Sequence, residues 1–310
     1  NKIEERSDFP GMWSPEVEAE RVIDFIKNKD NVRPKDQPFF LMWAPNPPHM
    51  PFEQVPQRFK DLFKDKSWEE LLLSPAFTEM TGPAPELPQD MQAQYEANMT
   101  LAKEEVRDYF AQIAGVDYYI GEVLKALDEA GLKEDTLVVF ASDHGDLMGS
   151  HGLIRKGPWF DDSVKIPYLI RWPGKLKPGK RNFLMNTPDI FPTLVSMVGL
   201  KDQLPSSIEG QDLSRLIMEE GLEDSIAYQD QAGGLAYFIN APMNARGVRS
   251  SDYYLVVLRN HYDEERYILY DLKKDPYQMK DVASEKPEVV KAYRALLQSW
   301  MEDCKDWWLL

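Results

Sequence analysis

The chain has 310 residues, 43% hydrophobic and 28% charged, which is typical of a globular protein and excludes disorder, a disulfide scaffold or a coiled coil as its main description. Its 36 basic and 52 acidic residues give a net charge of −16, which argues against nucleic acid or an anionic membrane as a partner bound through overall charge. At roughly 100–200 residues per domain, this length allows one large domain or two.

Helices and short strands alternate through the first two thirds of the chain. A helix is expected over residues 14–28, because Pro15 suits the first turn and apolar side chains recur at helical spacing. The apolar strand expected next, residues 38–44, ends in a proline-rich loop that carries His49. The uncharged run 37–52 is too rich in proline to span a membrane as a helix, so no membrane span is expected.

One long helix, residues 92–130, is expected in the middle of the chain. An interruption near Gly115 is left open, and Gly131 suits the C-terminal cap of the helix. Residues 136–141 form an apolar, β-branched run without alternation, which is typical of a strand covered by helices on both faces. A further strand is expected at residues 166–172.

Beyond about residue 215 the pattern changes to short strands followed by a closing helix. We therefore expect an α/β protein with two parts. Residues 1–215 would form the large domain, a mixed sheet flanked by helices, and residues 216–310 a small C-terminal antiparallel sheet plus a helix. Before that boundary a helix is expected over 187–199, and after it strands at 225–229, 245–249, 253–259 and 266–271 and a helix at 286–303.

Chemically useful side chains follow the 136–141 strand directly. Asp143 and His144 stand at its carboxyl end, where α/β sheets bind ligands, and together they suit a metal ion or an anion held by one. A solvated turn fits these two residues equally well. Arg155 and Lys156 follow in a glycine-rich loop and form the local positive patch that an anionic substrate requires, although an exposed surface loop has the same composition.

Prolines on both sides of His49 limit its motion and pre-organise it for proton transfer or hydrogen bonding, although most loop histidines are structural. His261 lies in a charged turn, and no role is assigned to it. The single cysteine, Cys304, has no histidine near it in sequence, so it is read as a packed or surface thiol.

In chain order, several motifs resemble the sulfatase family of the alkaline-phosphatase superfamily. Pro48-His49-Met50-Pro51 is similar to the PHxP loop of that family. The segment SDHGDLMGSHG at 142–152 resembles its S-D-H/N-G-x-x-x-G-x-H-G loop for metal and substrate, and Lys156-Gly157 follows at the usual distance. Residues 209–213 and 269–279 resemble its later segments, so the match runs through nearly the whole chain.

The resemblance implies an alkaline-phosphatase-like fold and the hydrolysis of a sulfate ester, with a sulfated sugar as the expected substrate. Asp143 and His144 would be ligands of a Ca²⁺ ion. His49 would contact the ester and protonate the departing oxygen, and Lys156 would bind a sulfate oxygen.

The two remaining site residues implied by the resemblance are His151 and Arg155, which would bind substrate by shaping the pocket at the leaving group. The nucleophile stays unknown. Sulfatases use a formylglycine made from Cys or Ser in a C/S-x-P-S-R motif, and these 310 residues contain no such motif. We therefore expect the missing N-terminal segment of the same protein as a partner and expect this chain to be inactive by itself. Periplasmic or secreted export is implied by the resemblance only.

Two alternatives stay open. A phosphodiesterase or a phosphonate monoester hydrolase of the same superfamily would use the same side chains, because sulfate and phosphate esters share geometry and charge type. The other is a non-catalytic remnant with a binding or regulatory role.

Overall fold

A computed structural model of the chain describes residues 12–78, 92–219 and 234–309. The chain forms two compact units, and each is described by itself. Unit 1 consists of Asn1–Leu73, Met91–Phe140 and Leu169–Gly174, and unit 2 of Ser74–Asp90, Ala141–Tyr168 and Lys175–Leu310. The boundary predicted at residue 215 stays a prediction, and the strand predicted at 225–229 lies outside the described residues.

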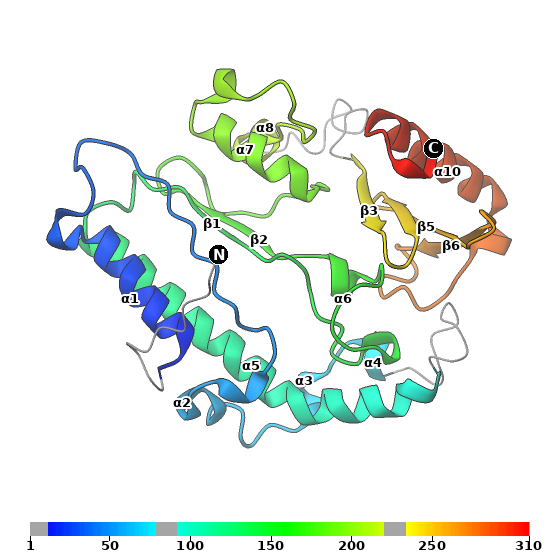
Figure 1. Cartoon of the computed structure of the whole chain (residues 1–310), viewed down its shortest axis with the longest axis horizontal. Helices are drawn as coiled ribbons and strands as arrows, with labels where there is room; N and C mark the ends of the chain where they lie inside the picture. Colours follow the sequence, from blue (N-terminus) through cyan, green and yellow to red (C-terminus); the bar gives the residue numbers. More distant parts are fainter. Residues whose placement is uncertain (1–11, 79–91, 220–233, 310) are drawn as a thin grey trace. The chain divides into compact units, whose positions relative to one another are not determined.

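Unit 1 is built on two helices that pack along each other, α1 (Ser14–Ile26) and α5 (Gln92–Glu129), as Figure 1 shows. The predicted cap of α5 is confirmed. Gly131 has a φ of +69°, and the Leu132 N–H donates to the Leu127 carbonyl at 3.0 Å. Two short helices, α2 (Gln57–Lys60) and α3 (Trp68–Leu71), also pack on α5.

Gly115 does not interrupt α5, which runs continuously through this position. A Cβ added at Gly115 would lie 2.5 Å from Cη2 of Trp13 and 3.0 Å from Cδ2 of Phe59. The glycine therefore admits an aromatic cluster against the helix, in which the Trp13 ring centroid lies 5.8 Å from that of Phe59 and 6.2 Å from that of Tyr119.

Two glycines of α5 are expected to respond oppositely to alanine. In Gly115→Ala, overpacking costs about 1–3 kcal/mol of unfolding free energy and outweighs the roughly 1 kcal/mol gained in helix propensity. In Gly121→Ala the new Cβ meets nothing within 4 Å, so the variant should gain about 0.5–1 kcal/mol. Urea denaturation of both variants measures the signs. A gain at both positions would show that Trp13 moves aside freely.

The prediction of a strand at residues 38–44 is wrong, because this segment forms no strand. Its side chains nevertheless alternate as those of a strand do. Leu41 and Trp43 pack on the cluster between α1 and α5, whereas Phe40 is 91% exposed and Met42 78% exposed. Among the described residues, no strand pairs with this segment.

The strands predicted at 136–141 and 166–172 are confirmed as β1 (Val138–Ala141) and β2 (Tyr168–Arg171), which pair in a two-stranded sheet. The cover expected on both faces of the first strand is not seen among the described residues, because Phe140 and Ala141 are exposed. The helix predicted at 187–199 is confirmed as a 3-10 turn, Thr187–Asp189, that leads into α7 (Ile190–Met197). None of the helices in the described ranges has the length and apolar character needed to cross a membrane. Besides α7, unit 2 contains the short helices α4 (Pro75–Thr78), α6 (Asp161–Val164) and α8 (Ser214–Met218).

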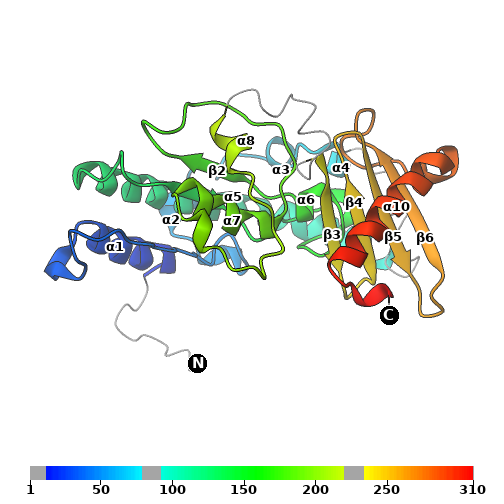
Figure 2. The same cartoon turned by 90° about the horizontal axis from the view of Figure 1, so that it is seen from above.

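An antiparallel sheet with one covering helix forms the C-terminal part of unit 2. Its strands lie in the order β3 (Ala236–Asn240), β4 (Ala245–Arg249), β5 (Tyr253–Arg259) and β6 (Glu265–Asp271). Helix α10 (Pro287–Asp303) lies across one face, as Figure 2 shows. The predictions for the last three strands and the helix are confirmed, and β3 was not predicted. The buried core between the helix and the sheet includes Leu255, Val257, Leu269, Leu297 and Met301.

The other face of this sheet is also buried, as the pattern of the 253–259 strand predicted. Tyr254 and Tyr270 point to this face and are 2% and 0% exposed. Trp159 and Phe160, which follow the loop of residues 143–157 that carries the predicted site residues (the site loop), are both 0% exposed. The Trp159 indole N–H donates to the Tyr270 hydroxyl at 3.0 Å, so the segment after the site loop is attached to the sheet.

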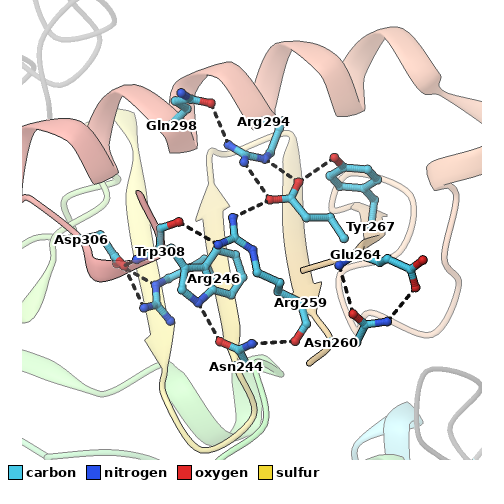
Figure 3. Close-up of polar contacts among 11 residues, drawn as sticks. Asn244, Arg246, Arg259, Asn260, Glu264, Tyr267, Arg294, Gln298, Asp306 and Trp308 are labelled. Atoms are coloured by element: carbon cyan, nitrogen blue, oxygen red, sulfur yellow. Dashed lines mark hydrogen bonds and ion pairs between the residues drawn. The ribbon is translucent and has the colours of Figure 1, made fainter. Parts of the chain in front are cut away.

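Buried ion pairs attach the chain's last turn and α10 to the same sheet (Figure 3). Arg246 donates to both carboxylate oxygens of Asp306, at 2.7 and 2.9 Å, and the two side chains are 0% and 3% exposed. Burial opposes the ionisation of Glu265, but hydrogen bonds from Arg294, Tyr267 and Arg259 outweigh it and lower the pKa of Glu265 to about 2. The Glu265 carboxylate therefore stays charged in mildly acidic solution.

Candidate active site

Asp143 and His144 leave the end of β1 side by side. His144 Nε2 lies 3.4 Å from Asp143 Oδ2, and the Asp143 side chain is 83% exposed. The other imidazole nitrogen, Nδ1, lies 2.7 Å from the Gly145 carbonyl oxygen. A proton on Nδ1 that donates to this carbonyl leaves Nε2 with a free lone pair, the form in which imidazole binds a metal.

These two side chains can supply part of the coordination shell of a Ca²⁺ ion but not a complete shell. Ca²⁺ takes about 6–8 oxygen ligands, and the pair offers one carboxylate and one imidazole. Within the three described ranges, no three His, Cys, Asp or Glu side chains are grouped so that they could hold a metal ion. Asp146 is engaged elsewhere, because its Oδ1 accepts the Met148 and Arg155 N–H groups at 3.0 and 3.2 Å.

A single serine of α6 holds both ends of the site loop. The Gly145 N–H donates to the Ser163 carbonyl at 2.8 Å, and the Gly157 N–H donates to the Ser163 hydroxyl at 3.0 Å. These glycines directly follow His144 and Lys156. The structure thus brings together the backbone segments that carry the predicted metal ligands and the predicted sulfate-binding lysine.

Gly145 is required by its close approach to α6. A Cβ added there would lie 2.1 Å from the Asp162 carbonyl oxygen, far inside van der Waals contact. Lys156 is exposed, and among the described residues it has no ion-pair partner. No carboxylate in the described part of the chain therefore neutralises its ammonium group. Arg155 is half-buried, and its carbonyl accepts the Leu147 N–H at 2.7 Å.

His151 is buried under an aromatic ring. It is 4% exposed and stacks on Phe160, with ring centroids 3.6 Å apart and planes inclined by 10°. Burial lowers the pKa of His151 to about 4, so the imidazole is neutral at pH 7. Packing accounts for this burial, and the predicted contact of His151 with substrate stays a prediction.

The buried His151 should make the protein less stable in acid. Its pKa of about 4 in the folded state lies below the ordinary value of 6.5. The unfolded chain therefore binds a proton that the folded protein excludes as pH falls from about 6.5 to 4. Between pH 7 and 4.5 this should remove about 2 kcal/mol of unfolding free energy.

Urea denaturation at both pH values measures this loss. His151→Asn, which cannot titrate and tolerates the positive φ of 56° at this position, should lose about 2 kcal/mol less than the wild type over this range. His261→Asn is the matched control, since His261 is exposed. An equal loss in the wild type and both variants would contradict a neutral, buried His151.

His49 lies in unit 1, on a loop that α5 holds in place. Its side chain is exposed, with Nδ1 2.7 Å from the Met50 carbonyl oxygen. Gln112 of α5 is 1% exposed and donates to the carbonyls of Pro51 and Phe52 at 2.9 and 3.0 Å. Sequence reasoning missed Gln112, although an amide on a buried helix face is a signal that a polar partner lies opposite.

Comparison with known proteins gives consistent matches. The family described as Sulfatase matches residues 2–200, and the family described as N-sulphoglucosamine sulphohydrolase, C-terminal, matches residues 149–305. An endo-4-O-sulfatase of Bacteroides thetaiotaomicron is 31% identical over 96% of this chain and 58% of its own length. An ulvan-active sulfatase of Formosa agariphila is 32% identical over 90% of this chain and 49% of its own length.

A solved structure from a study of glycosaminoglycan metabolism by Bacteroides thetaiotaomicron has a TM-score of 0.81 and 30% identity, and it aligns with 96% of this chain and 60% of its own. The expected α/β, alkaline-phosphatase-like fold is thereby confirmed. The chain spans 58% and 49% of the two curated relatives named above. Because the sulfatase match covers well over half of its residues, this chain belongs to the sulfatase family.

Proposed function

We propose that this chain carries the metal-binding and sulfate-binding side of a sulfatase that acts on a sulfated sugar. The observation that carries the proposal is the pair of hydrogen bonds that Ser163 accepts from Gly145 and Gly157. These bonds hold both ends of the loop that carries Asp143, His144 and Lys156. A carboxylate, an imidazole and an unneutralised ammonium group suit a sulfate ester that bears negative charge on its oxygens.

Each residue has a distinct part in the proposed reaction. Asp143 and His144 would hold Ca²⁺, which when bound supplies positive charge to the sulfate oxygens. Lys156 binds a sulfate oxygen and offsets the charge that builds up in the transition state. In the protonated form of His49, Nδ1–H donates to the Met50 carbonyl and Nε2–H is free to protonate the departing sugar oxygen.

The nucleophile belongs to sequence outside these 310 residues in this proposal. The match with this chain covers only 58% and 49% of the two relatives, which leaves room in them for a segment with a formylglycine. Phe40 and Met42 are exposed on an extended segment that pairs with no strand in the described ranges, and they are the surface that such a segment would cover. We infer that this segment of the same protein is the chain's partner, and that the enzyme is exported.

A sulfated sugar is favoured over other esters by the relatives. One is named for the 4-O position of its substrate and another for its activity on ulvan. A phosphodiesterase or phosphonate monoester hydrolase is the second candidate, because the same three side chains suit a phosphate ester. Turnover of a matched pair of sulfate and phosphate esters distinguishes the two candidates.

The proposal is tested by sulfate release from 4-O-sulfated oligosaccharides in the presence of Ca²⁺. The protein expressed from the complete reading frame should release sulfate, and the 310-residue chain alone should not. Release by the 310-residue chain would contradict an external nucleophile. No release by the complete protein from any sulfated sugar in a broad panel would contradict the proposed function.

A further inference from the structure

We propose that Gln278, Arg249 and Asp161 are positioning residues that hold the site loop in place from the C-terminal sheet. The inference rests on the proposed function only for the catalytic role of the loop. The contacts that link Gln278 to the loop through Asp161 are independent of that role. None of the three residues has been given a role in the reaction above.

Gln278 and Asp161 make a reciprocal pair although 117 residues separate them. The Asp161 backbone N–H donates to Gln278 Oε1 at 2.9 Å, and Gln278 Nε2 donates to Asp161 Oδ1 at 2.7 Å. Gln278 is 1% exposed, so its amide cannot exchange these partners for water. A buried amide with both ends engaged at one residue fixes that residue's backbone and side chain together.

Arg249 adds a charge to this pair. It lies at the end of β4 and forms an ion pair with the same oxygen of Asp161 that accepts from Gln278. Both side chains of the ion pair are largely buried, at 22% and 20% exposed. One carboxylate oxygen therefore receives donors from the last residue of β4 and from the segment after β6.

Asp161 transmits this fixation because it is the first residue of α6. Two residues later in the same single-turn helix, Ser163 binds the N–H groups of Gly145 and Gly157. The path runs from Gln278 through Asp161 and one helical turn to the residues that directly follow His144 and Lys156. Displacement of Asp161 should therefore move the proposed metal ligands and the sulfate-binding lysine together.

The sheet also touches the loop at points that do not involve Gln278. Asn240 of β3 donates to the Gly157 carbonyl, and Trp159 donates to Tyr270 of β6. These contacts should keep the loop folded when the Gln278 pair is removed. The expected defect is a loosened loop on an intact fold.

Hydrogen exchange of the protein from its complete reading frame tests this directly. Gln278→Ala should speed amide exchange in residues 143–157 about tenfold and leave exchange in residues 253–271 unchanged. Gln298→Ala is the matched control, because Gln298 is exposed on α10 and its hydrogen-bond partners among the described residues are Arg294 and Glu302 of the same helix. Unchanged exchange at 143–157 would overturn the proposal. Faster exchange in both regions, with a lower urea midpoint, would also overturn it, because Gln278 would then serve general stability.

Steady-state kinetics on a sulfated sugar supplies the second readout. A displaced Lys156 charge weakens the transition state more than substrate binding, so Gln278→Ala should lower kcat about tenfold with KM within twofold of wild type. A normal kcat would overturn the positioning role. If the wild-type protein turns over no sulfate ester, the proposed function fails, and the exchange experiment still decides whether Gln278 positions the loop.

Discussion

Lys156→Ala is expected to lower kcat/KM of the complete enzyme for a sulfated sugar by about 10²–10³-fold. The lysine is exposed, has no ion-pair partner among the described residues and directly precedes Gly157, whose N–H donates to the Ser163 hydroxyl. The backbone next to Lys156 is thus held in place, and in the proposed reaction its ammonium group meets a sulfate oxygen. The loss should be in kcat as well as in kcat/KM, because charge builds up on the sulfate oxygens in the transition state.

Lys291→Ala is the matched control for this variant. Lys291 is an exposed lysine on α10 in the same unit, and its removal should leave both kinetic constants within twofold of wild type. Lys156→Arg keeps the charge but changes its geometry, so it should recover only part of the loss. A Lys156→Ala enzyme with wild-type kcat/KM would remove this residue from the reaction.

Arg246→Ala is expected to lower the free energy of unfolding by about 3–5 kcal/mol. The substitution leaves the Asp306 carboxylate buried without its bidentate partner and removes a guanidinium that stacks on the Trp308 ring, 4.6 Å from its centroid. The last turn of the chain is attached to β4 through this pair. Urea denaturation followed by tryptophan fluorescence measures the loss.

Arg215→Ala controls for the removal of an arginine from an ion pair. Arg215 and Glu219 are paired at 2.8 Å but are 73% and 51% exposed. Such surface pairs contribute about 0–1 kcal/mol, so the control should be close to wild type. The double variant Arg246→Met/Asp306→Leu should recover most of the loss, because no charge is left unpaired. Equal losses in Arg246→Ala and Arg215→Ala would contradict the account of the buried pair.

Most helices and strands could be predicted because caps, turns and hydrophobic spacing are set by residues close together in the sequence. The cap at Gly131, the two-faced burial of the 253–259 strand and the closing helix all follow from a few adjacent residues. The segment at 38–44 has the alternation of a strand, but a strand also needs a pairing partner, which no local pattern supplies. The sequence alone leaves a break at Gly115 open, because the reason for this glycine, the Trp13 ring, lies about a hundred residues away in sequence.

Motifs predict the candidate site residues, but not which residues hold the loop that carries them. Gln278 lies in the 269–279 segment that resembles the family and Ser163 lies in no motif, and the role of both comes from contacts with Gly145, Gly157 and Asp161. A buried amide such as Gln278 leaves a weak signal at best. Long-range hydrogen bonds of this kind require the folded arrangement to be seen.

The most direct test of the central claim is a comparison of matched sulfate and phosphate esters as substrates of the protein expressed from its complete reading frame. We expect the sulfate ester to be hydrolysed faster, a calcium chelator to abolish turnover, and Lys156→Ala to reduce it. Hydrolysis of the phosphate ester with none of the sulfate ester would contradict a sulfatase and favour the phosphoryl hydrolase alternative.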